Sequence, residues 1–167
     1  MRWLLFLLPL AVWAELRTGI EFARPGGQPL AMDAFIPAGK GPFPAIVWVH
    51  GGGFTRGDKA PAPMGVLEPI ARQGYAWFSV NYRLAPQSAF PAQTDDVEAA
   101  VAYVKAHAAE FKIDRRKLVL MGASAGGHLV SFVGAKHTKG NSVAAVVSFF
   151  GEHDLVDRVH SKPKARA

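Results

Sequence analysis

The chain has 167 residues, half of them hydrophobic and 19% charged, which is enough for one folded domain and excludes a disordered chain. It contains no cysteine, and this excludes disulfides and thiolate metal sites. The net charge is +6, but no basic stripe with interleaved aromatic residues follows a predicted helix, so we expect no nucleic-acid partner. Basic residues crowd the segment 156–167, which we expect to be an irregular, solvated tail.

Residues 1–14 have the pattern of a secretory signal peptide. Arg2 precedes an apolar run from Trp3 to Val12, and Val12 and Ala14 put small residues at the −3 and −1 positions of a cleavage site. The run is too short to cross roughly 30 Å of hydrocarbon. We therefore expect cleavage after Ala14, no stable membrane span, and a secreted or periplasmic protein. An uncleaved apolar arm or anchor is the alternative.

The next residues predict strands. Segments 18–23 and 30–37 are two early strands around a turn rich in glycine and proline. Four later runs are almost wholly apolar and rich in β-forming residues, at 45–50, 75–82, 117–122 and 143–150. Uninterrupted apolar strands are typical of parallel strands that are buried on both faces.

Helical patterns separate these runs. The strongest follows an apolar stripe from Val97 to Phe111, and we expect Thr94 or Asp95 to cap it, with Asp95 and Glu98 forming a capping box. Weaker helices are expected at 64–73 and 125–136. Alternating strands and helices predict an α/β fold with right-handed crossovers.

The pentapeptide from Gly122 to Gly126 places Ser124 between a predicted strand and a predicted helix. A turn that sharp crowds the backbone, so small residues are needed on both sides of the serine. It would leave the hydroxyl exposed and put the amide of Ala125 at a helix N-terminus. The pattern indicates a nucleophile elbow. A glycine-rich turn that only packs is the alternative.

The segment "HGGGF" at 50–54 directly follows an apolar strand. Successive glycines leave two or three amides free to point at one spot, as an oxyanion hole requires. A tight turn or a phosphate-binding loop are alternatives, but no Gly-Lys-Ser/Thr follows. We expect His50 to position this loop rather than act as a base, and His128, four residues after Ser124, to have a packing role.

Four segments together resemble the α/β-hydrolases of the hormone-sensitive-lipase-like and feruloyl/acetyl-esterase-like branch. They are "HGGGFTRGDK" (50–59), "NYRLAPQSAFPAQTDDVEAAVAYV" (81–104), "LMGASAGGHL" (120–129) and "SFFGEHDL" (148–155). Their order and spacing match the family over residues 18–155. The resemblance implies a three-layer α/β sandwich with a mostly parallel sheet, and no cofactor or metal.

The resemblance also implies roles for individual residues. Ser124 would be the nucleophile, and the amides of Gly51, Gly52 and Ala125 would form the oxyanion hole. Loop-positioning residues would be His50, Gly53, Gly122 and Gly126. Tyr82, Arg83 and Asp96 look like framework positions.

In this family the triad acid and histidine follow the seventh and eighth strands, and only 17 residues follow Phe150. We therefore expect residues 15–155 to be the N-terminal portion of a hydrolase domain, truncated after the sixth strand and without the acid and the base. His153 is a candidate substitute for the base. The sheet would be incomplete at its C-terminal end, and we expect self-association through the exposed edge.

The predicted function is hydrolysis of a small carboxylic ester through an acyl-enzyme on Ser124. Acyl groups on a polysaccharide are candidate substrates. Two alternatives stay open: an amide or peptide hydrolase on the same scaffold, and an inactive fragment or non-catalytic binding module.

Overall fold

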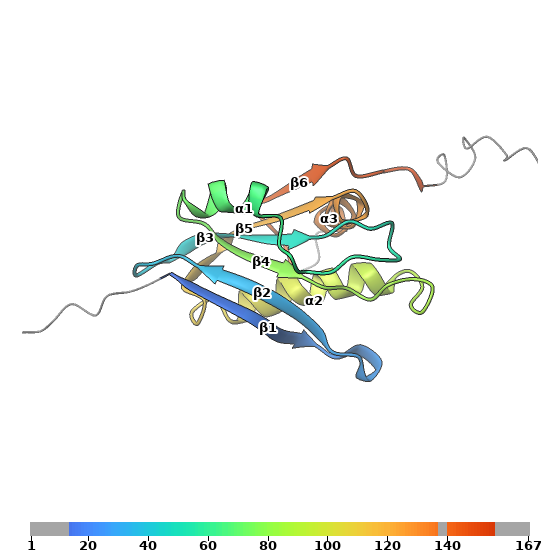
Figure 1. Cartoon of the computed structure of the whole chain (residues 1–167), viewed down its shortest axis with the longest axis horizontal. Helices are drawn as coiled ribbons and strands as arrows, with labels where there is room; N and C mark the ends of the chain where they lie inside the picture. Colours follow the sequence, from blue (N-terminus) through green and yellow to red (C-terminus); the bar gives the residue numbers. More distant parts are fainter. Residues whose placement is uncertain (1–13, 137–139, 156–167) are drawn as a thin grey trace, which may run out of the picture.

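The computed structural model describes residues 14–136 and 140–155, and a six-stranded sheet with the order β1-β2-β4-β3-β5-β6 forms its centre (Figure 1). The strands are β1 (Glu15–Ala23), β2 (Leu30–Ile36), β3 (Phe43–Val49), β4 (Ala76–Val80), β5 (Ile113–Ala123) and β6 (Ala145–Phe149). The helices are α1 (Met64–Ala71), α2 (Ala92–Ala106) and α3 (Ala125–Lys136), with a short 3-10 turn η1 (Pro25–Gly27) between β1 and β2.

The sheet is mostly parallel, as predicted. Strand β3 pairs in parallel with both β4 and β5, and β5 pairs in parallel with β6. Among the described strands, only β1 and β2 introduce antiparallel pairs, β1 with β2 and β2 with β4. The carboxyl ends of β3, β4, β5 and β6 therefore meet at one edge of the sheet, where open α/β sheets carry their sites.

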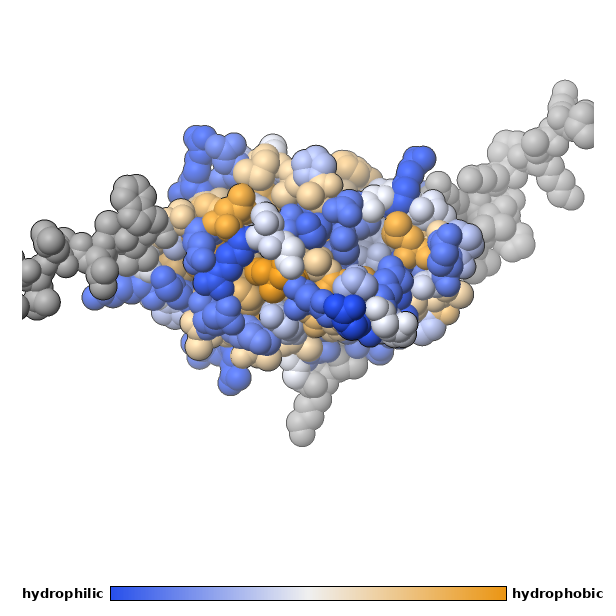
Figure 2. Space-filling model, turned by 60° about the horizontal axis from the view of Figure 1, so that its bottom comes forward, coloured by the Kyte–Doolittle hydropathy of each residue, from blue (hydrophilic) through white to orange (hydrophobic). Residues whose placement is uncertain are grey.

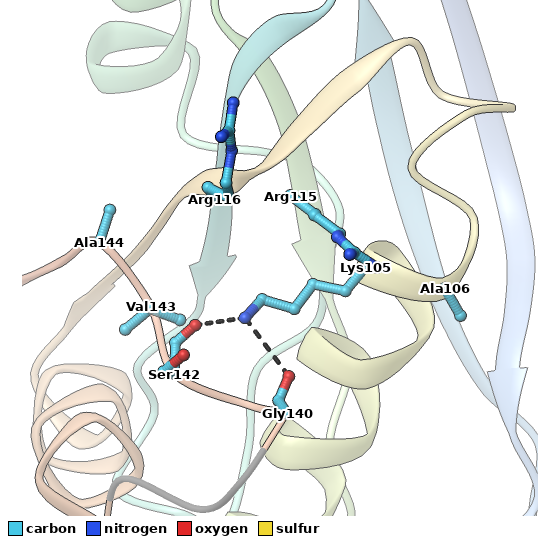
Figure 3. Close-up of a pocket in the computed structure, with 8 residues that line it drawn as sticks. All are labelled: Lys105, Ala106, Arg115, Arg116, Gly140, Ser142, Val143 and Ala144. Carbon is cyan, nitrogen blue, oxygen red and sulfur yellow. Dashed lines mark hydrogen bonds between the residues drawn. The ribbon is translucent and has the colours of Figure 1, made fainter.

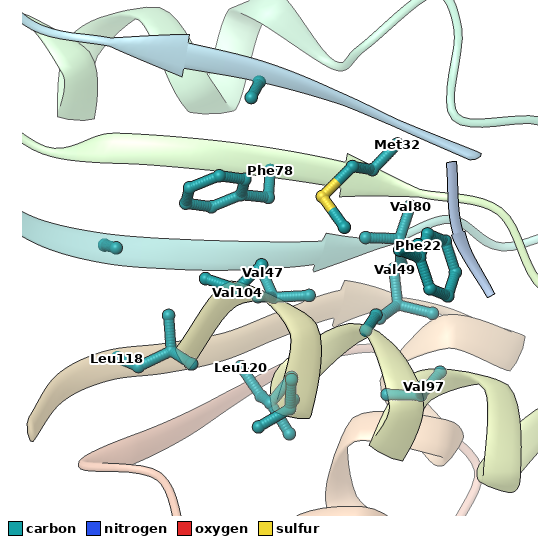
Figure 4. Close-up of a cluster of buried hydrophobic side chains, with 14 of the residues drawn as sticks. Phe22, Met32, Val47, Val49, Phe78, Val80, Val97, Val104, Leu118 and Leu120 are labelled. Carbon is teal, nitrogen blue, oxygen red and sulfur yellow. The ribbon is translucent and has the colours of Figure 1, made fainter. Parts of the chain in front are cut away.

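Helices cover both faces of the sheet (Figure 1). On one face, Leu67 of α1 is fully buried against Trp48 and Trp77. On the other face, α2 and α3 pack on the larger core, and Figure 4 shows Val97 and Val104 of α2 directed at the side chains of the sheet. This three-layer arrangement confirms the predicted α/β sandwich.

On the face shown in Figure 2, hydrophobic residues lie in small groups among hydrophilic ones. The central strands are covered, since all of Ala76–Val80 is buried and so is the second half of β3. This agrees with the prediction of strands buried on both faces.

The start and end of α2 differ from the prediction. The helix begins at Ala92 with Pro91 at its N-cap and no side-chain cap, so the capping box of Asp95 with Glu98 is wrong. Pro91 starts the helix earlier because a proline at a helix start loses no backbone hydrogen bond. The helix ends at Ala106, and Phe111 lies in the following turn, although it is buried and packs edge-on against Phe78.

Strand β6 lies at the edge of the sheet. Within the described residues it pairs only with β5, and Ala145 and Val146 are exposed. The exposed edge expected after the sixth strand is therefore present, although the apolar sequence of this strand is typical of a strand covered on both faces. An apolar sequence reports the propensity for a central strand, whereas the neighbours present decide how much of it is covered.

The predicted signal peptide, except Ala14, and the predicted tail 156–167 lie outside the described residues. In the part of the chain that the structure describes, no helix combines the length and the apolar character needed to cross a bilayer. The same part contains no group of three or more histidine, cysteine or acidic side chains placed to hold a metal ion.

Candidate active site

Ser124 is the single residue between the end of β5 and the start of α3. Its φ of +54° lies in the left-handed region, which a non-glycine residue adopts at a cost. The side chain is exposed, while the Ser124 amide donates a hydrogen bond of 2.8 Å to the carbonyl of Phe149 at the end of β6. The strained turn is thus held by the neighbouring strand, and the serine projects beyond the carboxyl edge of the sheet.

The glycines on both sides of Ser124 lie where the backbone of β3 passes close by. A Cβ atom on Gly126 would lie 2.1 Å from the carbonyl oxygen of Val49 and 2.5 Å from that of His50. A Cβ atom on Gly122 would lie 2.6 Å from the carbonyl oxygen of Gly126. The crowding expected from the sequence is present, and its cause is the end of β3.

The glycine loop after β3 lies against the serine. A Cβ atom on Gly51 would be 3.2 Å from the Cβ atom of Ser124 and 2.8 Å from the carbonyl oxygen of Ala123. Within residues 14–136 and 140–155, the amides of Gly51, Gly52 and Ala125 donate no hydrogen bond to the protein. The segments that the sequence predicted to work together therefore meet, with amide donors still available. Gly53, with a φ of +61°, borders the small cavity beside Ser124.

His50 is buried and contacts the glycine loop through its ring and its backbone. Its Nδ1 lies 2.7 Å from the carbonyl oxygen of Gly51, and its ring stacks on Tyr82 with centroids 4.3 Å apart. The hydroxyl of Tyr82 donates to the carbonyl of His50 at 3.1 Å. Burial lowers the pKa of His50, because it disfavours the charged imidazolium. Such contacts suit a residue that positions the loop.

Gly57 is a contributor that the sequence reasoning missed. Its φ is +113°, and a Cβ atom there would lie 2.3 Å from Nδ1 of His50 and 2.5 Å from the carbonyl oxygen of Gly51. A side chain at this position would push His50 out of place. The glycine in "TRGDK", part of the matched segment 50–59, was the available signal, but the spacing alone does not show that residue 57 packs against the ring of His50.

The residues predicted as framework brace the chain after β4. Both oxygens of the Asp96 carboxylate, which is almost fully buried on α2, accept hydrogen bonds from the Arg83 guanidinium, the shortest at 2.7 Å. The amide of Arg83 also donates to Asp96 at 2.8 Å. Tyr82, the residue before Arg83, is thereby held with its ring stacked on His50. Burial raises the pKa of the Tyr82 phenol.

His128 joins α3 to the segment after β6. Its Nδ1 lies 2.5 Å from the carbonyl oxygen of Glu152, and its ring contacts Phe54 edge-on at 5.7 Å. Because a carbonyl only accepts, Nδ1 carries the proton. His153 is exposed. Within the described residues, no histidine forms a hydrogen bond to the hydroxyl of Ser124.

Two adjoining cavities lie beside the serine. The smaller, of about 20 Å³, has room for about one water molecule and is bordered by Ser124, Phe54 and His128. The larger, of about 210 Å³, is apolar and is lined by Phe54 and His128 as well as by Phe90. The larger apolar cavity therefore lies beside the small cavity that Ser124 borders.

The BD-FAE family model matches residues 32–167 of the chain. The chain belongs to the BD-FAE family. It is also 35% identical over 128 residues to the esterase LipC of Mycobacterium tuberculosis (strain ATCC 25618 / H37Rv), a match that covers 70% of this chain and 32% of LipC. A BD-FAE chain with this relative is of ester-hydrolase lineage, as the sequence motifs predicted.

Solved structures agree with this family. A bacterial heroin esterase matches with a TM-score of 0.63 and 32% identity, over 78% of this chain and 41% of its own length. A truncated form of a carbohydrate esterase from gut microbiota matches with a TM-score of 0.74 and 26% identity, over 85% of this chain and 58% of its own. The α/β-hydrolase fold is confirmed. The BD-FAE chain spans about a third of the length of LipC.

Proposed function

We propose that Ser124 is the nucleophile of a carboxylic ester hydrolase. The observation that carries the proposal is the exposed serine at a strained strand-to-helix corner, with Gly51 packed against it. Amides of Gly51, Gly52 and Ala125 would donate to the oxyanion that forms on the substrate carbonyl. The ester-hydrolase lineage supports this role.

The reaction would proceed through an acyl-enzyme. The oxygen of Ser124 attacks the ester carbonyl carbon, its proton passes to an imidazole base, and the alcohol leaves with a proton returned by that base. Water then attacks the acyl-enzyme and releases the acid. We propose that the base and its acid partner belong to the part of a complete hydrolase domain that follows residue 155.

The apolar cavity favours an ester whose acyl or aryl part is small. Phe54 and Phe90 line it, and about 210 Å³ accommodates a short acyl chain or a single ring. Acyl groups on a polysaccharide would fit, because only the acyl part must enter the cavity while the sugar stays in water. The similarity to a carbohydrate esterase supports this substrate class.

Labelling with a fluorophosphonate probe tests the nucleophile. Because the proposed base follows residue 155, we expect slow labelling of the chain, supported by the oxyanion hole alone, and loss of the label in Ser124→Ala. The matched control is Ser131→Ala on α3, whose hydroxyl bonds the carbonyl of Gly127 and faces no cavity at the elbow. Hydrolysis of p-nitrophenyl acetate and of p-nitroacetanilide, measured beside the labelling, separates an esterase from an amidase.

Two results would contradict the proposal. Equal labelling of Ser124→Ala and the parent chain would place the nucleophile elsewhere. A folded parent chain that takes no label would favour a non-catalytic fragment.

We also propose that the protein is exported and cleaved after Ala14. Strand β1 begins at Glu15, so the cleavage would leave the first strand whole. N-terminal sequencing of protein recovered from the periplasm or the medium should begin at Glu15. Recovery of the uncleaved Met1 terminus from the cell interior would show that residues 1–14 do not act as a signal.

A further inference from the structure

A basic pocket lies at the amino ends of β5 and β6, at the opposite end of these strands from Ser124. Arg115 and Arg116 stand near the start of β5, whereas Ser124 directly follows its end, about 30 Å away at the usual rise of a strand. Lys105, in the last turn of α2, enters the same pocket (Figure 3). The pocket measures about 520 Å³ and is separate from the cavities at the elbow.

Three cations and no carboxylate line this pocket among the described residues. Figure 3 shows that Arg115 extends toward Lys105, whereas Arg116 extends away from it. Arg116 pairs with Asp114 at 3.1 Å, but the side chain of Arg115 makes no hydrogen bond or ion pair within residues 14–136 and 140–155. Lys105 and Arg115 thus face each other with no carboxylate of the described residues beside them.

Lys105 is held in this position by the loop before β6. Its Nζ donates to the carbonyl of Ser142 and, at 3.4 Å, to that of Gly140 (Figure 3). Partial burial and the nearby charge of Arg115 lower the pKa of Lys105. The ammonium group is therefore fixed beside a like charge, an arrangement that an anion would stabilise.

We propose that this pocket binds a small ligand through an oxyanion group, as an ancillary site distinct from the catalytic one. The planar Arg115 fork suits the two oxygens of a carboxylate or phosphate, and the fixed Lys105 supplies a point charge. A volume of about 520 Å³ is that of a small-molecule site and has room for a monosaccharide-sized body behind the anionic group. The net charge of +6 attracts such ligands from solution.

Binding to the full chain tests this site. Sodium glucuronate, inorganic phosphate and neutral glucose are titrated by isothermal calorimetry at constant ionic strength. We expect one of the two anions to bind and glucose not to bind. Binding of glucuronate alone identifies a carboxylated sugar as the ligand class, and binding of phosphate alone identifies a phosphorylated one.

Arg115→Gln should weaken the binding at least fivefold, because it removes the fork and leaves the loop contacts of Lys105 in place. Arg72→Gln, which removes an exposed arginine directly after α1 and changes the net charge equally, should bind like the parent. The thermal midpoints of both variants establish that they are folded. If Arg115→Gln only weakens binding, Arg115→Glu should abolish it. The site is overturned if neither anion binds, or if Arg115→Gln and Arg72→Gln bind alike. Anion binding at this pocket is measured without any reaction at Ser124, so its failure would leave the proposed nucleophile untouched.

Discussion

At the residue scale, the elbow depends on the absence of a side chain at position 126. The carbonyl oxygens of Val49 and His50 occupy the space that a Cβ atom on Gly126 would need. Both are backbone atoms at the end of β3, so neither can move aside without shifting the strand. The same contact brings the glycine loop to Ser124, which makes Gly126 a determinant of both stability and the site.

We expect Gly126→Ala to lower the free energy of unfolding by about 3 kcal/mol or more, because the added methyl overpacks against backbone. Gly65→Ala is the matched control, since nothing lies within 4 Å of a Cβ atom there and the residue is in α1. It should raise stability by about 0.5 kcal/mol through helix propensity. Urea denaturation measures both, and equal effects would show that the elbow is not tightly packed.

At the scale of elements, the pair of Arg83 and Asp96 ties the segment after β4 to α2. The contact spans thirteen residues of sequence and buries a carboxylate at the start of the helix. The sequence suggested a framework role for both residues only through the family resemblance. It assigned the neighbouring acids Asp95 and Glu98 to a cap, because local spacing does not show which acid will meet a distant arginine.

Edge strand β6 is the element most exposed to other chains. Its pairing with β5 leaves one side without a partner in the described residues, and apolar edges of this kind pair with other strands. Self-association through β6 stays a prediction, and a charge on the edge should oppose it.

Ala145→Lys should raise the dissociation constant of self-association about tenfold, equivalent to about 1.4 kcal/mol, without removing a packed side chain. Ala102→Lys, on an exposed position of α2, adds the same charge away from the edge. Size-exclusion chromatography with light scattering over a concentration series measures the effect. A parent chain that is monomeric throughout, or two variants that associate alike, would refute the prediction.

At the scale of the whole molecule, the buried His50 makes stability depend on pH. Burial is the main cause that lowers its pKa, against the hydrogen bond to the Gly51 carbonyl and the charge of Asp58, which raise it. In the unfolded chain the imidazole titrates near its ordinary value of 6.5, so below that pH the unfolded state binds more protons than the folded state. Stability should therefore be full above pH 6.5 and fall as the pH drops toward the lowered pKa.

We expect His50→Gln to be less stable at pH 7.5, because the stacking on Tyr82 is lost, but to show a smaller drop between pH 7.5 and 5. Urea midpoints of both chains across this range give the two slopes. The difference between them isolates His50, since every other titratable group is shared. Parallel slopes would show that His50 is not held neutral by the fold.

The amino-acid sequence by itself determined the α/β class, the central buried strands and the position of Ser124 between a strand and a helix. These depend on apolar runs, glycine spacing and helical periodicity, which act over a few residues and can be read locally. The family resemblance rested on the same local motifs.

Only the tertiary structure decided which distant groups meet. It brought Gly51 to Ser124, packed Gly57 against His50 and paired Asp96 with Arg83. It also collected Lys105 and Arg115 into one pocket. Contacts of this kind depend on strand order and on the crossing of chain segments far apart in sequence, and no local pattern encodes them.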